Sequence, residues 1–284
     1  SAMGCCDCLH VEKYKIPGAE PTFFLSMRFL GFWSMIFPAI TAYVCIISTF
    51  YTQADIISNY SLANCPHVKS PLPPISYSIG SWEPQKQMWM FAVIVHMPSR
   101  MLLSRSIPQI WLEGIWRLAG YAATTIEMFS LTMVSLFYVD SIAGFEVHAA
   151  FFGMWWGATV WGMSIMIHMQ RVTGHIYQDP YIYRSWLVKS VIMTAYIIVS
   201  CTTSIAYPIS QRNCSLFAFT IFCIGEYTII TLNAAFWAIV LLEVSRDFEG
   251  FRIVAVMSKR RAIEKYSTEN PTMKIAIKKK IEKH

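Results

Sequence analysis

Six long apolar stretches alternate with shorter polar segments along the chain. The hydrocarbon core of a bilayer is about 30 Å thick and a helix rises about 1.5 Å per residue, so about 20 mainly apolar residues can cross it. The stretches that meet or approach this length are residues 25–50, 88–103, 111–139, 147–169, 186–207 and 216–242. The second is the shortest and contains Pro98 and Arg100. The pattern predicts an all-α fold: a polytopic membrane protein that forms a bundle of six transmembrane helices.

The overall composition agrees with a membrane protein. Of the 284 residues, 55% are hydrophobic and only 14% are charged, whereas soluble domains carry about 25% charged residues. This composition excludes a soluble enzyme and a disordered chain. The net charge of +6 is modest and most basic residues flank the predicted spans, so nucleic-acid binding is excluded as the main role. We expect an N-terminal segment (1–24), a six-span transmembrane domain (25–245) and a basic tail (246–284).

The basic residues predict the orientation of the helices, because Lys and Arg are enriched in cytosolic loops. With six spans, both termini lie on one side of the membrane. That side holds all of the 23 Lys and Arg residues except Lys69, Lys86 and Arg212. Both termini are therefore predicted to be cytosolic. The sequons at Asn59 and Asn213 both fall on the predicted lumenal side, where glycosylation takes place, although such triplets also occur by chance.

The placement of the cysteines points to one disulfide bond. Cys65 and Cys214 are the two cysteines in predicted lumenal loops, and an oxidising lumen favours their pairing. The alternative is two unpaired loop thiols. The sequence contains no spacing of His, Cys, Asp and Glu that is typical of a metal site, and we expect neither a metal nor a bound cofactor.

Several polar side chains lie within the predicted spans, where a charge is costly unless it faces protein or a wet cavity. Measured from the lumenal ends of their helices, His96 lies about 12 Å deep, Arg100 and Glu127 about 18 Å, and Glu226 about 15 Å. These four residues therefore share one layer of the membrane. Asn233 follows Glu226 by two helical turns and lies on the same helix face.

Two interpretations of this layer remain open. Arg100 paired with Glu127 or Glu226 would be nearly neutral and would only hold helices together. Two carboxylates, one guanidinium and one imidazole exceed the needs of a single ion pair, which favours a polar cavity that admits a lipid headgroup or a reacting group. His148 lies at the predicted lumenal mouth, where a solvated helix cap is the simpler interpretation of its position.

Several segments of the sequence match a known family in their order. They are Asn64-Cys65 with the Pro-rich run that follows, Pro98-Ser99-Arg100, Glu127, Glu146-Val147-His148, Cys214, Glu226-Tyr227-Thr228 and Asn233-Ala234-Ala235-Phe236. Together they resemble the family of post-GPI-attachment-to-proteins factor two, which is related to the N-terminal part of fungal cell-wall GPI-remodelling proteins. The match covers residues 22–247. The N-terminal segment and the basic tail have no counterpart in it.

The resemblance implies lipid remodelling of GPI anchors in the lumenal leaflet of the Golgi or endoplasmic reticulum membrane. The reaction would refill the vacant glycerol hydroxyl of a lyso-GPI with a saturated acyl chain, taken from acyl-CoA or from a phospholipid. Such an acyl transfer needs a base and a donor group for the oxyanion. We expect His148, or else His96, to be the base, oriented by Glu127 or Glu226.

Arg100 and Asn233 are expected to bind the substrate, with Arg100 either at the phosphate of the anchor or at the developing charge. The expected partners are membrane lipids, lyso-GPI or GPI-anchored proteins, and other enzymes of GPI remodelling. The alternative is a non-catalytic protein that binds, transports or scaffolds GPI lipids. A carrier predicts binding without product and a cavity continuous between both leaflets, whereas a transferase predicts product and an opening to the lumen.

Overall fold

Helices dominate the computed structural model, which describes residues 23–62, 64–70, 72–138, 142–177, 179–247 and 250–253. The chain divides into two compact units: Ser26–Glu249, and the two chain ends Ser1–Leu25 and Gly250–His284. The described strands β1 (Phe23–Ser26) and β4 (Gly250–Ile253) pair in a two-stranded sheet. Most of the predicted N-terminal segment and basic tail lie outside the described residues.

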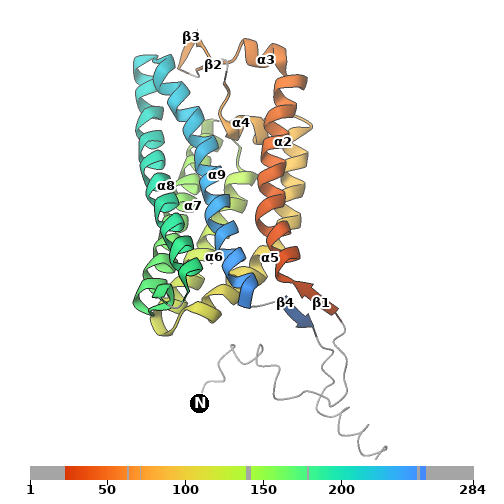
Figure 1. The fold of residues 1–284 in the computed structure, drawn as a ribbon. Helices are drawn as coiled ribbons and strands as arrows, with labels where there is room; N and C mark the ends of the chain where they lie inside the picture. Colours follow the sequence, from red (N-terminus) through yellow and green to blue (C-terminus); the bar gives the residue numbers. More distant parts are fainter. Residues whose placement is uncertain are drawn as a thin grey trace, which may run out of the picture. The chain divides into compact units, whose positions relative to one another are not determined.

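Within the described part of the chain, long helical segments form the unit Ser26–Glu249. The first combines α1 (Met27–Gly31), the π-helical turn η3 (Phe32–Ile36) and α2 (Phe37–Thr52); the others are α5 (Gln85–Trp111), α6 (Gly114–Leu136), α7 (Ile142–Val172), α8 (Pro180–Asn213) and α9 (Leu216–Asp247). The closest packing joins α8 to α9, α6 to α7, and α2 to α5 (Figure 1). The short elements are α3 (Ala54–Ser58), β2 (Ser61–Leu62), β3 (Cys65–Lys69), α4 (Ile75–Gly80) and the 3-10 turn η4 (His175–Tyr177).

Each predicted span falls mainly within one of these helical segments, but the helix ends differ from the prediction. α5 is longer than the predicted 88–103 and continues through two prolines. The third span was predicted to begin at residue 111, whereas α6 begins at Gly114. The reason is a turn: Leu112 and Glu113 are extended, and Gly114 has a φ of 54°, which glycine adopts without steric cost.

Four helical segments are long and apolar enough to cross a membrane: Met27–Thr52, Gly144–Val172, Pro180–Asn213 and Leu216–Val244. Among the described residues, α5 and α6 are 27 and 23 residues long, but they are not apolar enough to be among these four segments. They carry Arg100 and Glu127, which lower their apolar character. Membrane crossing by α5 and α6, and with it the six-span count, stays a prediction.

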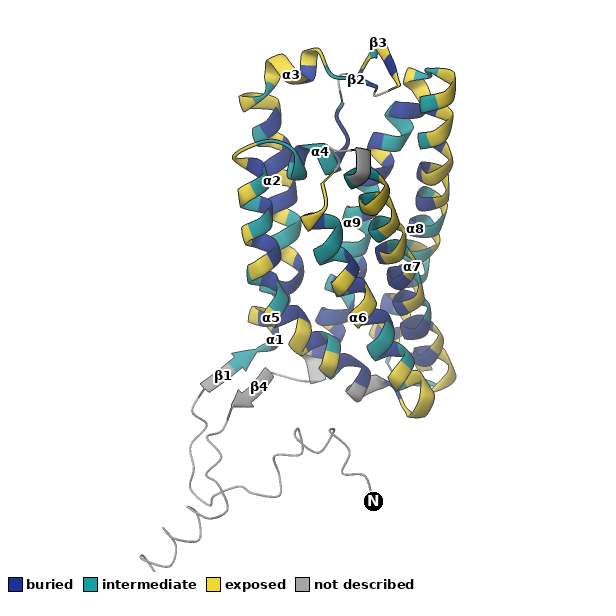
Figure 2. Cartoon of the chain, turned by 180° about the vertical axis from the view of Figure 1, so that it is seen from behind, coloured by how far each residue is buried: buried dark blue, intermediate teal, exposed yellow. Residues whose placement is uncertain are grey.

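α8 is apolar on its outer face and polar on its inner face. The outer face has exposed aliphatic side chains that recur every one or two turns: Leu187, Val191, Ile198 and Ile205. The inner face has buried hydroxyl groups: Tyr196, Ser200 and Thr203. Figure 2 shows exposed and buried positions alternating along the long helices in this way. This pattern inverts that of a soluble bundle and is expected where lipid surrounds the helices.

One end of the bundle is closed by a disulfide-linked cap. Cys65, in β3, is bonded to Cys214, which follows α8, so the predicted disulfide is confirmed. β2 and β3 form an antiparallel pair beside it. α4 lies deeper than this pair and packs against α2, α5 and α9 (Figure 1). We term the end that carries Cys65 and Cys214 the disulfide end, and the segment 72–80, which turns back into the bundle, the re-entrant segment.

Candidate functional site

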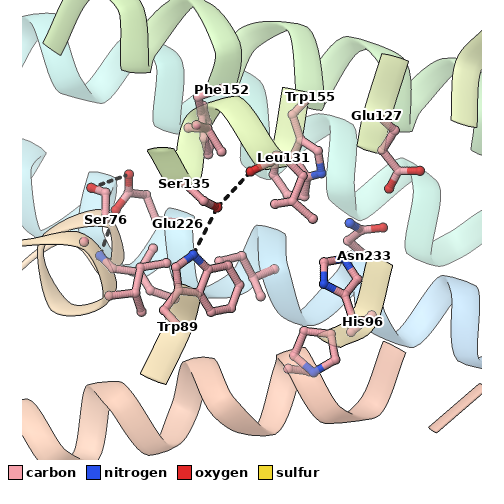
Figure 3. A pocket seen from close by; sticks show the side chains of 18 of the residues that line it. Ser76, Trp89, His96, Glu127, Leu131, Ser135, Phe152, Trp155, Glu226 and Asn233 are labelled. Carbon is pink, nitrogen blue, oxygen red and sulfur yellow. Dashed lines mark hydrogen bonds between the residues drawn. The ribbon is translucent and has the colours of Figure 1, made fainter. Parts of the chain in front are cut away.

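A cavity of about 120 Å³ lies inside the bundle. It is lined by all six residues that the sequence analysis selected for substrate binding and catalysis: His96, Arg100, Glu127, His148, Glu226 and Asn233. Figure 3 labels His96, Glu127, Glu226 and Asn233 among them. We term it the central chamber. The structure therefore brings together side chains from α5, α6, α7 and α9. Their chemical roles stay predictions.

Arg100 and Glu127 form an ion pair between α5 and α6. Arg100 Nη2 lies 2.6 Å from Glu127 Oε1, and the two side chains are 11% and 3% exposed. Arg100 also donates to the sulfur of Met35, and its guanidinium carbon lies 5.2 Å from the centre of a Trp237 ring, within the range of a cation–π contact. The sequence left Glu127 and Glu226 open as partners of Arg100, and the partner is Glu127.

Glu226 binds the re-entrant segment instead. Its carboxylate accepts hydrogen bonds from the Ile75 N–H at 2.9 Å and from the Ser76 hydroxyl at 3.5 Å. The neighbouring Tyr227 donates its hydroxyl to the Pro73 carbonyl oxygen at 2.6 Å. The first amides of a helix have no partner within the helix. Glu226 supplies a hydrogen-bond partner to the first amide of α4, and so it holds the re-entrant segment against α9.

Both histidines of the central chamber direct Nδ1 to a backbone carbonyl oxygen. His96 Nδ1 lies 3.1 Å from the Ala92 oxygen, and His148 Nδ1 lies 2.7 Å from the Phe137 oxygen. A neutral imidazole that donates from Nδ1 keeps its lone pair on Nε2, so Nε2 is the basic atom of each ring. The expectation that a carboxylate orients the imidazole is not met, because both carboxylates have the other partners described above. His96 is buried and His148 is half-buried.

Two buried polar atoms of the central chamber have no hydrogen-bond partner among the described residues: Asn233 Oδ1 and Trp155 Nε1. In Figure 3, Asn233 appears between His96 and Glu127, and the ring nitrogen of Trp155 points toward the chamber. Buried polar atoms are nearly always paired with protein or ordered water. These two atoms therefore mark places where a ligand or water can supply one donor and one acceptor.

A second cavity, of about 250 Å³, lies between the re-entrant segment, α7, α8 and α9. It shares four lining residues with the central chamber: Ser76, His148, Phe152 and Glu226. We term it the outer chamber, because its α9 lining begins at Phe219, closer to the disulfide end than the α9 lining of the central chamber. His148 therefore lies on the boundary between two cavities.

A second buried ion pair was not predicted from the sequence. Lys189 Nζ lies 2.5 Å from Glu243 Oε2, and both side chains are fully buried. Gln170 donates to the same carboxylate oxygen at 2.9 Å and accepts from Lys189 at 2.7 Å, which joins α7, α8 and α9. Lys189 lies near the end of a predicted span, where lysine commonly extends to the membrane surface, and it was assigned to the cytosolic flank. In the sequence, the residue that could have indicated this ion pair is Glu243, an acidic residue just beyond the sixth predicted span.

The long helices surround a chamber whose mainly apolar lining carries several charged and polar side chains, and four of them are apolar enough to span a bilayer, which defines a helical membrane protein. The model of the Frag1/DRAM/Sfk1/Cwh43P N-terminal domain matches residues 27–247, and the chain belongs to this family. The matched range contains every residue that lines the central chamber.

Two curated relatives refine the comparison. The chain is similar to Post-GPI attachment to proteins factor 2 of Drosophila pseudoobscura pseudoobscura, with 22% identity over 208 residues, or 72% of this chain and 74% of that protein. The protein of the same name from Drosophila melanogaster is 23% identical over 212 residues, or 73% of this chain and 76% of that protein. No solved structure matches the chain. The resemblance stated from the sequence is confirmed.

Proposed function

We propose that this protein transfers a saturated acyl chain to the free glycerol hydroxyl of lyso-GPI, in the lumenal leaflet of Golgi or endoplasmic reticulum membranes. The names of the two relatives support a role in processing GPI anchors. The observation that carries the proposal is the position of His148: its ring, with the lone pair on Nε2, lies where the central and outer chambers meet.

The proposed topology places the disulfide end in the lumen and both termini in the cytosol. α5 and α6 are about 40 and 35 Å long, enough to cross a hydrocarbon core of about 30 Å, and they supply the two polar spans of a six-span bundle. The Arg100–Glu127 pair reduces the cost of burying charge in them. The Cys65–Cys214 disulfide supports the lumenal assignment, because such bonds persist in oxidising compartments.

In the proposed reaction, His148 Nε2 accepts the proton of the lyso-GPI hydroxyl while the hydroxyl oxygen attacks the carbonyl carbon of the acyl donor. The new ester bond forms and the bond to the leaving group breaks. The proton passes from His148 to that leaving group, which is the CoA sulfur or the glycerol oxygen of a phospholipid. Trp155 Nε1–H, a donor with no partner among the described residues, is suited to the oxyanion.

The deeper side chains position the acyl donor in this scheme. His96 and Asn233 come from neighbouring parts of the central chamber lining and offer hydrogen bonds to the donor ester. Arg100 lies on the part of the lining that continues away from the disulfide end. Arg100 binds Glu127, which lies ten residues along the chain from Phe137, the partner of His148, or about 15 Å along the helix axis. We therefore assign Arg100 to positioning the donor beyond its reacting ester, rather than to the developing charge or to the phosphate of the headgroup.

A second candidate function is non-catalytic binding or transport of GPI lipids. One observation favours it: Glu127 and Glu226, the carboxylates of the central chamber, bind Arg100 and the re-entrant segment rather than a histidine. The chamber would then hold a lipid and present it to partner enzymes of GPI remodelling.

The two functions separate in a reconstituted assay. The full-length protein in nanodiscs is given lyso-GPI with a labelled acyl donor, acyl-CoA in one arm and phosphatidylcholine in the other. We expect product with the wild type and a loss of about 10²- to 10⁴-fold in His148→Ala, the usual contribution of a general base. His67→Ala is the matched control, because His67 is an exposed histidine of β3 at the disulfide end. Binding without product in either arm would favour the carrier, and full turnover in His148→Ala would refute the assigned base.

A further inference from the structure

The outer chamber is larger than the central chamber, with about 250 Å³ against about 120 Å³. A water molecule in the liquid takes up about 30 Å³, so the outer chamber has room for about eight water molecules or for one hydroxylated ring. Its lining extends from Thr203 to Gln211 on α8 and from Phe219 to Glu226 on α9, which is about 10–12 Å along the bundle axis. The proposed reaction uses only the inner boundary of this space, at His148.

In the proposed topology, the outer chamber lies at the level of the lumenal lipid headgroups. α9 has 32 residues and is about 48 Å long, whereas the hydrocarbon core is about 30 Å thick, so the ends of α9 extend beyond the core. Phe219 lies in the first turn of α9. At the same end, the side-chain oxygen of Gln211 accepts a hydrogen bond from the Asn64 N–H of the disulfide-linked cap at 3.3 Å. A lipid would therefore occupy the outer chamber with its headgroup rather than with its hydrocarbon chain.

The lining of the outer chamber is aromatic and hydroxylated but carries no Lys or Arg. Of the 16 described residues that line it, seven are Tyr or Phe and three are Ser or Thr. The one carboxylate, Glu226, already accepts hydrogen bonds from the re-entrant segment. A phosphate group therefore meets no basic side chain in this lining. An uncharged ring with hydroxyl groups fits it better, because its C–H faces pack against aromatic rings and its hydroxyls pair with side-chain hydroxyls.

The aromatic rings of the outer chamber are held in place by one another. The ring of Tyr207, on α8, lies 5.4 Å from that of Phe145, on α7, and 4.8 Å from that of Phe222, on α9, between ring centres. On the opposite wall, the ring of Tyr60 lies 5.4 Å from that of Tyr77, in the re-entrant segment. Rings that are ordered before a ligand arrives lose little conformational freedom when it binds. The outer chamber therefore presents aromatic faces that are preorganised for a ligand.

We propose that the outer chamber binds the inositol ring of the acceptor lipid, and that contacts with this ring rather than with the phosphate select the lipid. The inference rests on the proposed function, because a glycerol hydroxyl at His148 Nε2 places the phosphodiester and then the ring toward the disulfide end. The axial length of about 10–12 Å accommodates these groups in that order. The ring packs against the aromatic side chains, and its hydroxyls pair with those of the lining.

Competition between lysolipids tests the selection without any need for catalysis. The full-length protein in nanodiscs binds radiolabelled lysophosphatidylinositol, and unlabelled lysophosphatidylinositol, lysophosphatidylglycerol and lysophosphatidic acid with the same acyl chain compete for it. All three carry a phosphate, and lysophosphatidylglycerol also carries hydroxyl groups but no ring. We expect lysophosphatidylinositol to compete at least about ten-fold better than the others at both low and high salt, because salt weakens contacts between a phosphate and an exposed cation. Equal competition by the three lipids, or a preference that high salt abolishes, would overturn the proposal.

Two glycines of α7 test the position of the ring. Gly153 lines the outer chamber, and a Cβ added there meets no atom within 4 Å, so a larger side chain can be added without displacing a neighbour. Gly153→Leu is expected to lower the affinity for lysophosphatidylinositol by about ten-fold or more, because the chamber cannot hold both the ring and the added side chain. Gly157→Leu is the matched control: the added Cβ again meets no atom within 4 Å, but Gly157 lines neither chamber. An unchanged affinity in Gly153→Leu, or an equal loss in both variants, would refute the assigned position.

Product formation, measured with lyso-GPI in the same nanodiscs, separates this inference from the proposed function. Selective binding of lysophosphatidylinositol without any acylated product would sustain the ring site and refute the transferase. Product from lyso-GPI together with equal binding of the three lysolipids would sustain the transferase and refute the ring site.

Discussion

Breaking the ion pair of Arg100 and Glu127 separates its contribution to stability from its contribution to function. The perturbation is a double-mutant cycle of Arg100→Met, Glu127→Leu and the double variant. The side chains are 11% and 3% exposed, so the relevant scale is that of buried pairs, for which removal of one partner costs about 3–5 kcal/mol. A surface pair would contribute only about 0–1 kcal/mol.

The structure also predicts the order of the two single variants. In Glu127→Leu, Arg100 keeps its contacts with the Met35 sulfur and the Trp237 ring, so we expect a cost near the lower limit of about 3 kcal/mol. In Arg100→Met, the Glu127 carboxylate loses the side-chain partner described for it, so we expect a cost near the upper limit of about 5 kcal/mol. The double variant leaves no buried charge at this place and is expected to lie within about 1 kcal/mol of the wild type.

The assay is thermal unfolding of each purified variant, followed as the loss of the monodisperse fraction. The single variants should lose on the order of 10 °C in melting temperature, and the double variant should recover most of that loss. Costs below about 1 kcal/mol in both single variants, or a double variant that shows the sum of the two costs, would refute the pairing. If the stable double variant keeps full turnover, the pair only holds α5 and α6 together; if turnover is lost, the pair also serves the chamber.

Three further predictions concern other contacts of the bundle. Glu226→Gln keeps the shape of the side chain but loses the charge that strengthens the hydrogen bond to the Ile75 amide, which should weaken that bond by about 1–2 kcal/mol. Hydrogen exchange of the Ile75 amide should then be on the order of ten-fold faster, and unchanged exchange would contradict the role assigned to Glu226. Lys189→Met leaves the buried Glu243 carboxylate without its cation, although the Gln170 amide still donates to it, and should lower stability by about 3–5 kcal/mol. The Lys189→Met, Glu243→Leu double variant should recover this stability; a melting temperature of Lys189→Met equal to that of the wild type would refute the prediction. Cys65→Ser removes a disulfide bond between residues 149 positions apart. Closing a loop of this length costs about 5 kcal/mol of chain entropy, so the variant should give a lower yield of folded protein. An undiminished yield would show that the disulfide is dispensable.

Much of the fold follows from the apolar pattern, because a bilayer requires helices of a narrow range of lengths. The ends of helices are less predictable, as the turn at Gly114 shows. No predicted element covered α4. The Pro-rich run before it is typical of a loop, and the contacts that draw the re-entrant segment into the bundle come from Glu226 and Tyr227, about 150 residues later. Such contacts depend on tertiary packing, which local sequence does not specify.

The sequence predicted which residues make up the candidate site and how deep they lie in the membrane, but not which of them pair with one another. Counting residues along a helix gives the height of a side chain in the membrane, because the rise per residue is fixed. It does not give the direction in which neighbouring helices face one another. For that reason the sequence placed Arg100, Glu127 and Glu226 in one layer but left the partner of Arg100 open. The packing of α5 against α6 decides it.

The two buried ion pairs of this bundle have similar chemistry but different surroundings, and the difference separates a site from a structural contact. Lys189 and Glu243 line neither the central chamber nor the outer chamber, and both are fully buried. Arg100 and Glu127 both line the central chamber. A charge beside a cavity can exchange part of its pairing for a polar group of a ligand, whereas a sealed charge cannot do so without an unpaired partner. Substitutions at Arg100 or Glu127 should therefore alter the binding of lyso-GPI or the acyl donor in nanodiscs, and substitutions at Lys189 or Glu243 should alter stability while leaving that binding intact.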